Sequence, residues 1–432
     1  MPETFAKAIL ALLQQDIRTI PREAADLFLN ILAVALSGAD SSSVDIAAAY
    51  LQEECPGSYH PLGREESVSP YACAMLDCFS SAIHAYDDIH FETTLHPAGP
   101  IFSALLAEVR KEPVSLQAYL EAFLIGMEAE CRFARYLFSN GSSSWYTTGI
   151  AGGLGAAAAI ARLRHFDEST AASAIAYGAA KASGIRGTHG SMTGSFVPSF
   201  AAGAGYEGAA LAQKGFTCSL DAIDGRSGLL TALNPKPSLR KALEGIGEEW
   251  ICLKTSTKPY PLGFISLAPL NCVDQLPPLT EIEEAVLTVS PTAAMLGGKP
   301  VPQNTYDGFV SLRWLTARAI LKKILLHDPL PEDLEASEEE KKLARKITVY
   351  ADEQFAEDQA RLEVLADGRW HIAYCEAPKG SAASPMNHED ILRKVRDLHT
   401  LEESVITALD NPDRYKDFVI SVTDSQINII EK

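Results

Sequence analysis

The sequence predicts a mainly α-helical fold with a smaller α+β region near its C-terminal end. First, apolar residues recur at helical spacing through most of residues 21–233. Second, the apolar–polar alternation typical of strands begins only after about residue 250. Third, helical spacing returns in the last thirty residues. A chain of 432 residues is long enough to form two domains of this kind.

The helical region is expected to begin with an amphipathic helix that extends through Leu13 and Ile17. Further helices are predicted over residues 22–36, 70–85, 116–138, 149–163, 171–184 and 201–213. Residues 187–195 are predicted to be a loop because Gly, Ser and Thr dominate them. Residues 149–163 are rich in Ala and Gly, and each Gly in a helix costs up to about 1 kcal/mol relative to Ala. We therefore expect close packing to stabilise this segment as a central helix.

The α+β region is predicted from short alternating segments. Strands are expected over residues 285–289, 346–350, 360–365 and 370–375. Asp367-Gly368, between the last two, is a hairpin signal. Helices are expected over residues 309–326 and 388–398, and in the C-terminal tail over residues 405–409 and 415–419.

Composition limits the possible partners and the compartment. The net charge of −19 argues against nucleic acid as a partner, because phosphate binding needs clustered Lys and Arg. The eight Cys are scattered without a CxxC pair, which is typical of a reducing compartment. The N-terminus lacks the basic start of a signal peptide, and no run of eighteen apolar residues predicts a membrane span. We therefore expect a cytoplasmic protein with no membrane partner.

Two Gly-rich segments invite other functional interpretations. Residues 149–155 only loosely resemble the dinucleotide motif GxGxxG, and no strand pattern precedes them. Residues 190–194 lack the GxSxG spacing of a serine hydrolase. Neither segment therefore predicts a nucleotide site or a nucleophilic serine.

The most informative segment is residues 87–97, where eleven residues hold three carboxylates, two imidazoles and two hydroxyls between apolar helical stretches. Such groups are costly to bury unless they serve a site. His96 is the first candidate for a general acid or base, and His90 is a second one. Asp87 and Asp88 are expected to divide two roles, one orienting a His and the other capping a helix. The spacing matches no familiar ligand pattern, so we expect no metal here.

Several motifs, in order along the chain, resemble those of the MmgE/PrpD family, which includes 2-methylcitrate dehydratase, cis-aconitate decarboxylase and iminodisuccinate epimerase. They are Asp87-Asp88-Ile89-His90, His96-Pro97, Ser144-Trp145-Tyr146-Thr147-Thr148-Gly149, Lys258-Pro259-Tyr260-Pro261, Asp367-Gly368, Pro378-Lys379-Gly380 and Ser384-Pro385-Met386. The resemblance covers most of the chain and implies a large all-helical domain, built from both chain ends, with a smaller α+β domain inserted. Residues 1–255 completed by 400–432 would form the first domain, and residues 256–399 the second. It also implies a homodimer, no cofactor, and an active site in the cleft between the domains.

The resemblance and the polar cluster together assign the candidate site residues. Catalytic roles are expected for His96, His90, Asp88 and Tyr146. Contacts to a small-molecule substrate are expected from Lys258, Asp87, Thr147, His189 and Tyr260.

Departures from the family pattern limit which of the family's substrates can be expected for this protein. Tyr146 stands where the decarboxylase branch has a His, and Gly194 stands where many members carry a Lys. Two further His positions of that branch are Val197 and Gly263 here. A tricarboxylate needs several cations in one desolvated pocket. We therefore expect cis-aconitate and 2-methylcitrate to be poor substrates.

The sequence thus favours a cofactor-independent lyase or isomerase. It would dehydrate, decarboxylate or epimerise a small organic or biosynthetic substrate next to a carbonyl or carboxylate. The alternative is a member that has lost the ancestral reaction and acts as a biosynthetic cyclase or a non-catalytic binding protein. The lost cations favour the alternative, and the retained acid–base cluster favours the enzyme. Arg186 and His189, in the Gly-rich loop, could supply a replacement charge.

Overall fold

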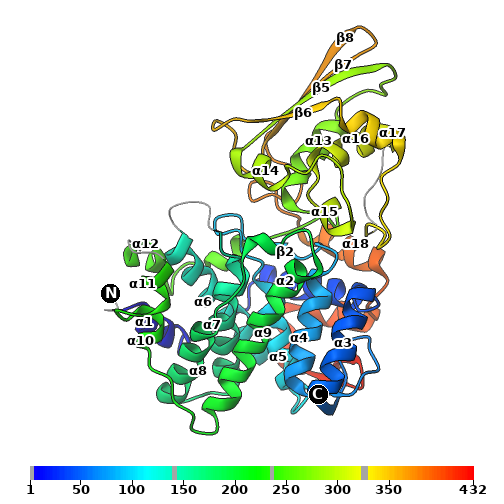
Figure 1. The fold of residues 1–432 in the computed structure, drawn as a ribbon. Helices are drawn as coiled ribbons and strands as arrows, with labels where there is room; N and C mark the ends of the chain where they lie inside the picture. The colour runs from blue at the N-terminus through cyan, green and yellow to red at the C-terminus, as the bar shows by residue number, and fades with distance from the viewer. Residues whose placement is uncertain (1–3, 139–143, 234–237, 323–328) are drawn as a thin grey trace.

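The computed structural model describes residues 4–138, 144–233, 238–322 and 329–432. Figure 1 shows two parts: a large helical body and a smaller α+β part above it. The helical body comprises α1 (Phe5–Leu12), α2 (Arg22–Ser37), α3 (Ser42–Glu54), α4 (Pro70–Ala82), α5 (Ala98–Val109), α6 (Leu116–Phe138), α7 (Thr147–Leu163), α8 (Glu168–Ala180), α9 (Met192–Ala212), α10 (Asp221–Asp224), α11 (Leu229–Leu233), α12 (Leu239–Leu243), α18 (His388–Leu398) and α19 (Glu403–Leu409). Short 3-10 helices are η1 (Arg186–Thr188), η2 (Ile251–Lys254), η3 (Phe264–Ser266) and η4 (Pro412–Asp417).

Helix α7 lies at the centre of the helical body, against α5, α6, α8 and α9. Its glycines permit this packing. A Cβ on Gly155 would lie 2.7 Å from the carbonyl oxygen of Gly126 in α6, and one on Gly153 would lie 2.9 Å from that of Gly178 in α8. The prediction of a central, closely packed helix is therefore confirmed, because neighbouring backbones come too close for larger residues.

Several predicted boundaries in this region were wrong. Helix α1 ends at Leu12 and does not reach Ile17, and α8 covers Glu168–Ala180 where residues 171–184 were expected. Helix α4 ends at Ala82, three residues before the expected end, because Ala85 takes a left-handed conformation with φ of 51°. Helix α9 begins at Met192, inside the segment expected to be a loop. The Gly and Thr composition misled here, because α9 packs on α4, α7 and α8 along its length, and tertiary packing outweighs local propensity.

The α+β part comprises α13 (Leu267–Asp274), β5 (Ile282–Val289), α14 (Pro291–Leu296), α15 (Thr305–Gly308), α16 (Leu312–Lys322), α17 (Glu338–Ala344), β6 (Ile347–Ala351), β7 (Ala360–Ala366) and β8 (Arg369–Cys375). The strands form one sheet in the order β6-β5-β7-β8, parallel between β5 and β6 and antiparallel elsewhere. All four predicted strands are confirmed, as is the hairpin at Asp367-Gly368, where both residues have positive φ. The expected helix over residues 309–326 begins at Leu312, and its expected end lies outside the described residues.

The C-terminal tail corrects the expectation of an all-helical large domain. Helix α19 confirms the predicted helix at residues 405–409, but residues 415–419 do not form an α-helix. The chain instead forms a hairpin of β9 (Phe418–Thr423) and β10 (Gln426–Glu431), and β9 also pairs with β3 (Val114–Ser115). The reason is local: both strands are rich in β-branched residues, and Asp424 makes the turn with φ of 53°.

Helix α18 packs against α2, and its apolar residues Ile391, Leu392 and Val395 enter the core of the helical body. Strands β2 (Asp88–Ile89) and β4 (Ser256–Thr257) form a separate two-stranded sheet. The short strand β1 (Pro56–Tyr59) follows α3. Within the described residues, no single helix is long and apolar enough to cross a membrane; α2 and α3 reach that length only together and are bent by 86°. All eight cysteines are free.

Candidate active site

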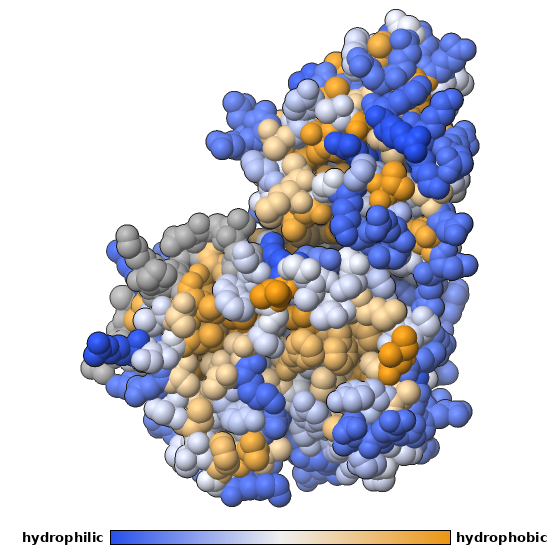
Figure 2. Space-filling model, in the orientation of Figure 1, coloured by the Kyte–Doolittle hydropathy of each residue, from blue (hydrophilic) through white to orange (hydrophobic). Residues whose placement is uncertain are grey.

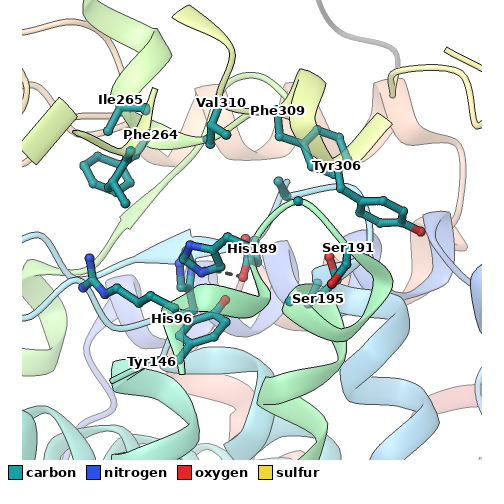
Figure 3. A pocket seen from close by; sticks show the side chains of 18 of the residues that line it. His96, Tyr146, His189, Ser191, Ser195, Phe264, Ile265, Tyr306, Phe309 and Val310 are labelled. Atoms are coloured by element: carbon teal, nitrogen blue, oxygen red, sulfur yellow. Dashed lines mark ion pairs between the residues drawn. The ribbon is translucent and has the colours of Figure 1, made fainter. Parts of the chain in front are cut away.

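A cavity of about 490 Å³ lies where the helical body meets the α+β part, and Figure 2 shows the surface hollowed between these two parts. One side is a polar wall, which we define as Asp87, His96, Tyr146, Arg186, His189, Ser191, Ser195 and Lys258. The facing side is an apolar wall, defined as Phe264, Ile265, Met295, Leu296, Phe309 and Val310. In Figure 3, His96, Tyr146 and His189 lie opposite Phe264 and Val310 across the cavity.

The pairing of β2 with β4 builds the base of the polar wall. Asp88 lies opposite Thr257, so the preceding Asp87 meets the following Lys258. Lys258 Nζ donates to Asp87 Oδ1 at 2.6 Å and to the carbonyl oxygen of Ala85 at 2.9 Å. Both side chains are almost fully buried, so the lysine charge is compensated inside the protein.

His96 is oriented through its Nδ1 atom. This atom lies 2.7 Å from the carbonyl oxygen of Asp88 and 3.1 Å from Asp87 Oδ2. Both neighbours are acceptors, so Nδ1 carries a hydrogen and Nε2 holds the lone pair of the neutral ring. The backbone N–H of His96 donates to Thr148 Oγ1 at 2.9 Å, which ties the residue to α7. His96 can therefore accept a proton at Nε2 while the Asp87 carboxylate steadies the resulting cation.

Asp87 is held as a carboxylate. Burial alone would raise its pKa, but the charges of His96 and Lys258, and the hydrogen bonds from both, hold that pKa well below its usual value. Asp87 thus remains an anion at neutral pH and links Lys258 to His96.

The Asp88 side chain does not lie in the cavity, where a catalytic role was expected for it. Its side chain is fully buried outside the cavity lining, and Oδ2 accepts from the backbone N–H of Ala98 at the start of α5. Burial and the neighbouring Asp87 raise the pKa of Asp88 to about 6. Its other oxygen, Oδ1, and both oxygens of Glu130 have no hydrogen-bond partner among the described residues. Asp88 contributes its carbonyl oxygen to His96 and its side chain to a helix start.

Tyr146 precedes α7 and stands between two imidazoles. Its ring makes edge-to-face contacts with His189 at 5.0 Å and with His96 at 6.3 Å between centroids. Burial, followed by the charge of Asp87, raises the pKa of the Tyr146 phenol, so it stays a hydrogen-bond donor. Burial and the nearby Arg186 lower the pKa of His189 to about 4, so that ring is neutral at pH 7.

The Arg186 guanidinium lies in the wall between this cavity and a second cavity of about 470 Å³. Its Nη2 donates to Thr94 Oγ1 at 2.6 Å and its Nε to the carbonyl oxygen of Trp145 at 3.3 Å. Thr94 has φ of 52°, a strained conformation for a β-branched residue. Thr147 Oγ1 donates to the carbonyl oxygen of Thr94 at 2.7 Å and helps to hold it there.

Besides Asp88, three expected site residues are not brought to the main cavity. His90 is fully buried, with Nδ1 2.9 Å from Thr93 Oγ1 and Nε2 3.2 Å from the carbonyl oxygen of Ile251, and burial lowers its pKa to about 4. Both ring nitrogens of His90 therefore bond within the protein, away from the main cavity. Thr147 lines the second cavity, and Tyr260 lines a small hollow beside Leu270, so neither reaches the main cavity.

Sequence reasoning missed Lys394 and the apolar wall. Lys394 is buried behind Lys258; its Nζ donates to the carbonyl oxygens of Tyr86 and Lys258, both at 3.0 Å, and lies 3.6 Å from the Tyr86 ring centroid. Burial and the charge of Lys258 lower its pKa well below the usual value. A signal was available, because Lys394 shares the apolar face of its helix with Ile391 and Val395 at helical spacing.

Two residues that replace cations of the related branch are sterically required to be Gly. A Cβ on Gly194 would lie 2.9 Å from the carbonyl oxygen of Thr188 and 3.2 Å from Cα of His189. A Cβ on Gly263 would lie 2.7 Å from Cγ1 of Val310. The loop before α9 and the apolar wall thus occupy the space that a Cβ atom at these two positions would need.

The described residues contain no group of three or more His, Cys, Asp or Glu arranged to hold a metal ion. Asp87 instead bonds to His96 and Lys258, and these two also bond to the backbone carbonyl oxygens of Asp88 and Ala85.

Comparison with known proteins agrees with this architecture. Residues 3–242 match the MmgE/PrpD N-terminal domain, and residues 267–407 match the MmgE/PrpD C-terminal domain. Two sequences of cis-aconitate decarboxylase from Aspergillus terreus, one of them from strain NIH 2624 / FGSC A1156, are each 23% identical to this chain. Each alignment covers 80% of this chain and 78% of the relative.

These matches cover more than half of the chain, in the two parts that the structure displays. The protein is of the class that joins a helical body to an α+β part, and it belongs to the MmgE/PrpD family. Membership and the distant similarity to a decarboxylase support a lyase-type function.

Proposed function

We propose that this protein is a lyase or isomerase that uses His96 to remove a proton from a carbon next to a carbonyl or carboxylate. The observation that carries the proposal is the orientation of His96. Its Nδ1 is bound to two acceptors, and the ring lines a cavity opposite an apolar wall. Such a ring presents Nε2 to the cavity as a general base.

The proton balance of the reaction is simple. Nε2 of His96 takes the proton, and the electron pair of the broken C–H bond moves into the adjacent carbonyl to form an enolate. The Tyr146 phenol donates a hydrogen bond to the enolate oxygen. The enolate then expels a leaving group from the next carbon, which takes the proton from the His96 cation as it departs, or regains a proton from a water molecule on its other face. The first course is an elimination such as dehydration, and the second is an epimerisation.

Decarboxylation would use the same groups, but His96 would donate a proton instead of accepting one. Loss of CO2 leaves the same kind of enolate, and the His96 cation returns a proton to the carbon. In each course the Asp87 carboxylate, itself held by Lys258, stabilises the protonated ring. The substrate is a small molecule, and we propose that the enzyme works in the cytoplasm as a homodimer without a cofactor.

A second candidate function is a binding protein or cyclase that uses the cavity mainly for its shape. The apolar wall and the internal pairing of Lys258 favour it. Convergence of His96, Tyr146 and Lys258 on one cavity favours the enzyme, although His90 lies outside that cavity.

Proton exchange separates these functions without knowledge of the complete reaction. A panel of carboxylic and 2-oxo acids is incubated with the protein in D2O, and loss of the α-proton signal is followed by NMR. We expect exchange that falls about a hundredfold or more in His96→Ala. His371→Ala, on β8 and outside the cavity, is the matched control and keeps the exchange rate. Unchanged exchange in a folded His96→Ala variant refutes the proposal.

A further inference from the structure

We infer that the cavity takes a substrate with one carboxylate on an apolar body, and that Arg186 binds this carboxylate. The inference rests on the proposed function for the site but concerns binding, so it is tested with ligands that do not react. It departs from the tricarboxylate that the similar decarboxylase acts on by name.

The first step is the charge of the polar wall. Lys258 is paired with Asp87 at 2.6 Å, and His189 is neutral at pH 7 because burial lowers its pKa to about 4. His96 is bound to the same Asp87 carboxylate. Among the described residues that line the cavity, Arg186 is the one permanent cation without an ion pair, because both its side-chain bonds go to neutral oxygens.

The second step is the geometry of Arg186. Thr94 and the carbonyl oxygen of Trp145 accept from Nη2 and Nε, which fixes the plane of the guanidinium. A guanidinium has five N–H donors, so donors remain for a carboxylate. Arg186 is partly buried, and its charge therefore lacks full solvation until an anion binds.

The third step is the opposite wall. Phe264, Phe309 and Val310 line the cavity and have hydrocarbon side chains, and Figure 3 shows them facing His96, Tyr146 and His189. Met295 also lines the cavity and is 61% exposed, so its apolar surface is unburied until a ligand covers it. An apolar body would cover this wall while its carboxylate meets Arg186.

The fourth step excludes further carboxylates. Backbone and Val310 occupy the space next to Gly194 and Gly263, where longer side chains could bring cations. A second or third carboxylate would therefore meet carbon atoms, neutral polar groups or the Asp87 carboxylate, without a counter-ion. Each uncompensated anion weakens binding, so a tricarboxylate is a poorer ligand than a monocarboxylate of similar size.

The test is isothermal titration calorimetry of the full chain with butanoate, hexanoate, octanoate, hexanamide and tricarballylate. We expect affinity to rise about fourfold for each added methylene until the wall is covered. Arg186→Gln should weaken hexanoate binding roughly tenfold to a hundredfold and leave hexanamide unchanged. Met295→Gln, at an exposed position, should reduce the gain from hexanoate to octanoate. Arg361→Gln, on β7 and outside the cavity lining, is the control and should bind like wild type.

The inference is overturned if hexanoate fails to bind at millimolar concentration, if tricarballylate binds more tightly than hexanoate, or if Arg186→Gln binds hexanoate normally. His96→Ala separates this inference from the proposed chemistry. If that variant binds hexanoate like wild type, the carboxylate is on Arg186, whatever the proton-exchange experiment gives. If His96→Ala instead weakens hexanoate binding tenfold to a hundredfold, the loss expected of Arg186→Gln, the carboxylate is on His96 and the inference is wrong.

Discussion

A double-mutant cycle at Asp87 and Lys258 tests the base of the polar wall without any substrate. Asp87→Asn keeps the shape of the side chain but removes its charge. Lys258 would then be a buried cation held only by the carbonyl oxygen of Ala85 and an amide. Lys258→Met removes the cation instead and leaves Asp87 buried against His96 alone.

The magnitude follows from burial. The Lys258 side chain is 2% exposed and that of Asp87 is 9% exposed, so neither unpaired charge can be solvated in place. Removal of one partner from such a pair costs about 3–5 kcal/mol, whereas replacing both by neutral groups costs much less. We therefore expect each single variant to lose about 3–5 kcal/mol of unfolding free energy. The double variant should lose less than either single one.

Urea unfolding, followed by circular dichroism, measures the three free-energy changes. The matched control is the Arg361–Glu363 pair, whose side chains are 45% and 24% exposed. Its single variants should lose about 1 kcal/mol or less. The reasoning is refuted if Asp87→Asn and Lys258→Met lose no more than this control, or if their losses simply add in the double variant.

Three further results are expected. Asp88→Asn should change the pH dependence of stability: the folded pKa of about 6 lies above the ordinary 3.8, so wild type loses about 3 kcal/mol as pH rises from about 4 to above 6. The variant should lack that loss in pH-dependent urea titrations, and parallel curves for the two proteins would contradict the assignment. The protein should be a homodimer, and light scattering that gives one 46.6 kDa species at micromolar concentration would show otherwise. Assays of itaconate formation and methylcitrate dehydration should show poor turnover of cis-aconitate and 2-methylcitrate, and ordinary enzyme rates with millimolar affinity would disprove the argument from missing cations.

The sequence by itself determined most of the secondary structure and the location of the polar cluster. Helical periodicity located α2, α6 and α7, and strict alternation located the four strands of the α+β part. These patterns are local, so they can be read along the chain. The tail was mistaken for helix, although its β-branched residues and the turn at Asp424 are local signals of the hairpin that forms there.

Only the tertiary structure decided which members of the polar cluster reach the cavity. His90 and His96 are six residues apart and chemically alike in sequence, yet one bonds to Ile251 and the other lines the cavity beside Asp87. The pairing of β2 with β4 makes that choice, because it brings Lys258 to Asp87 across 171 residues of chain. The apolar wall is likewise a product of folding, since its residues come from loops and short helices of the α+β part. The direction of each side chain depends on contacts between segments far apart in sequence, and no local pattern encodes those contacts.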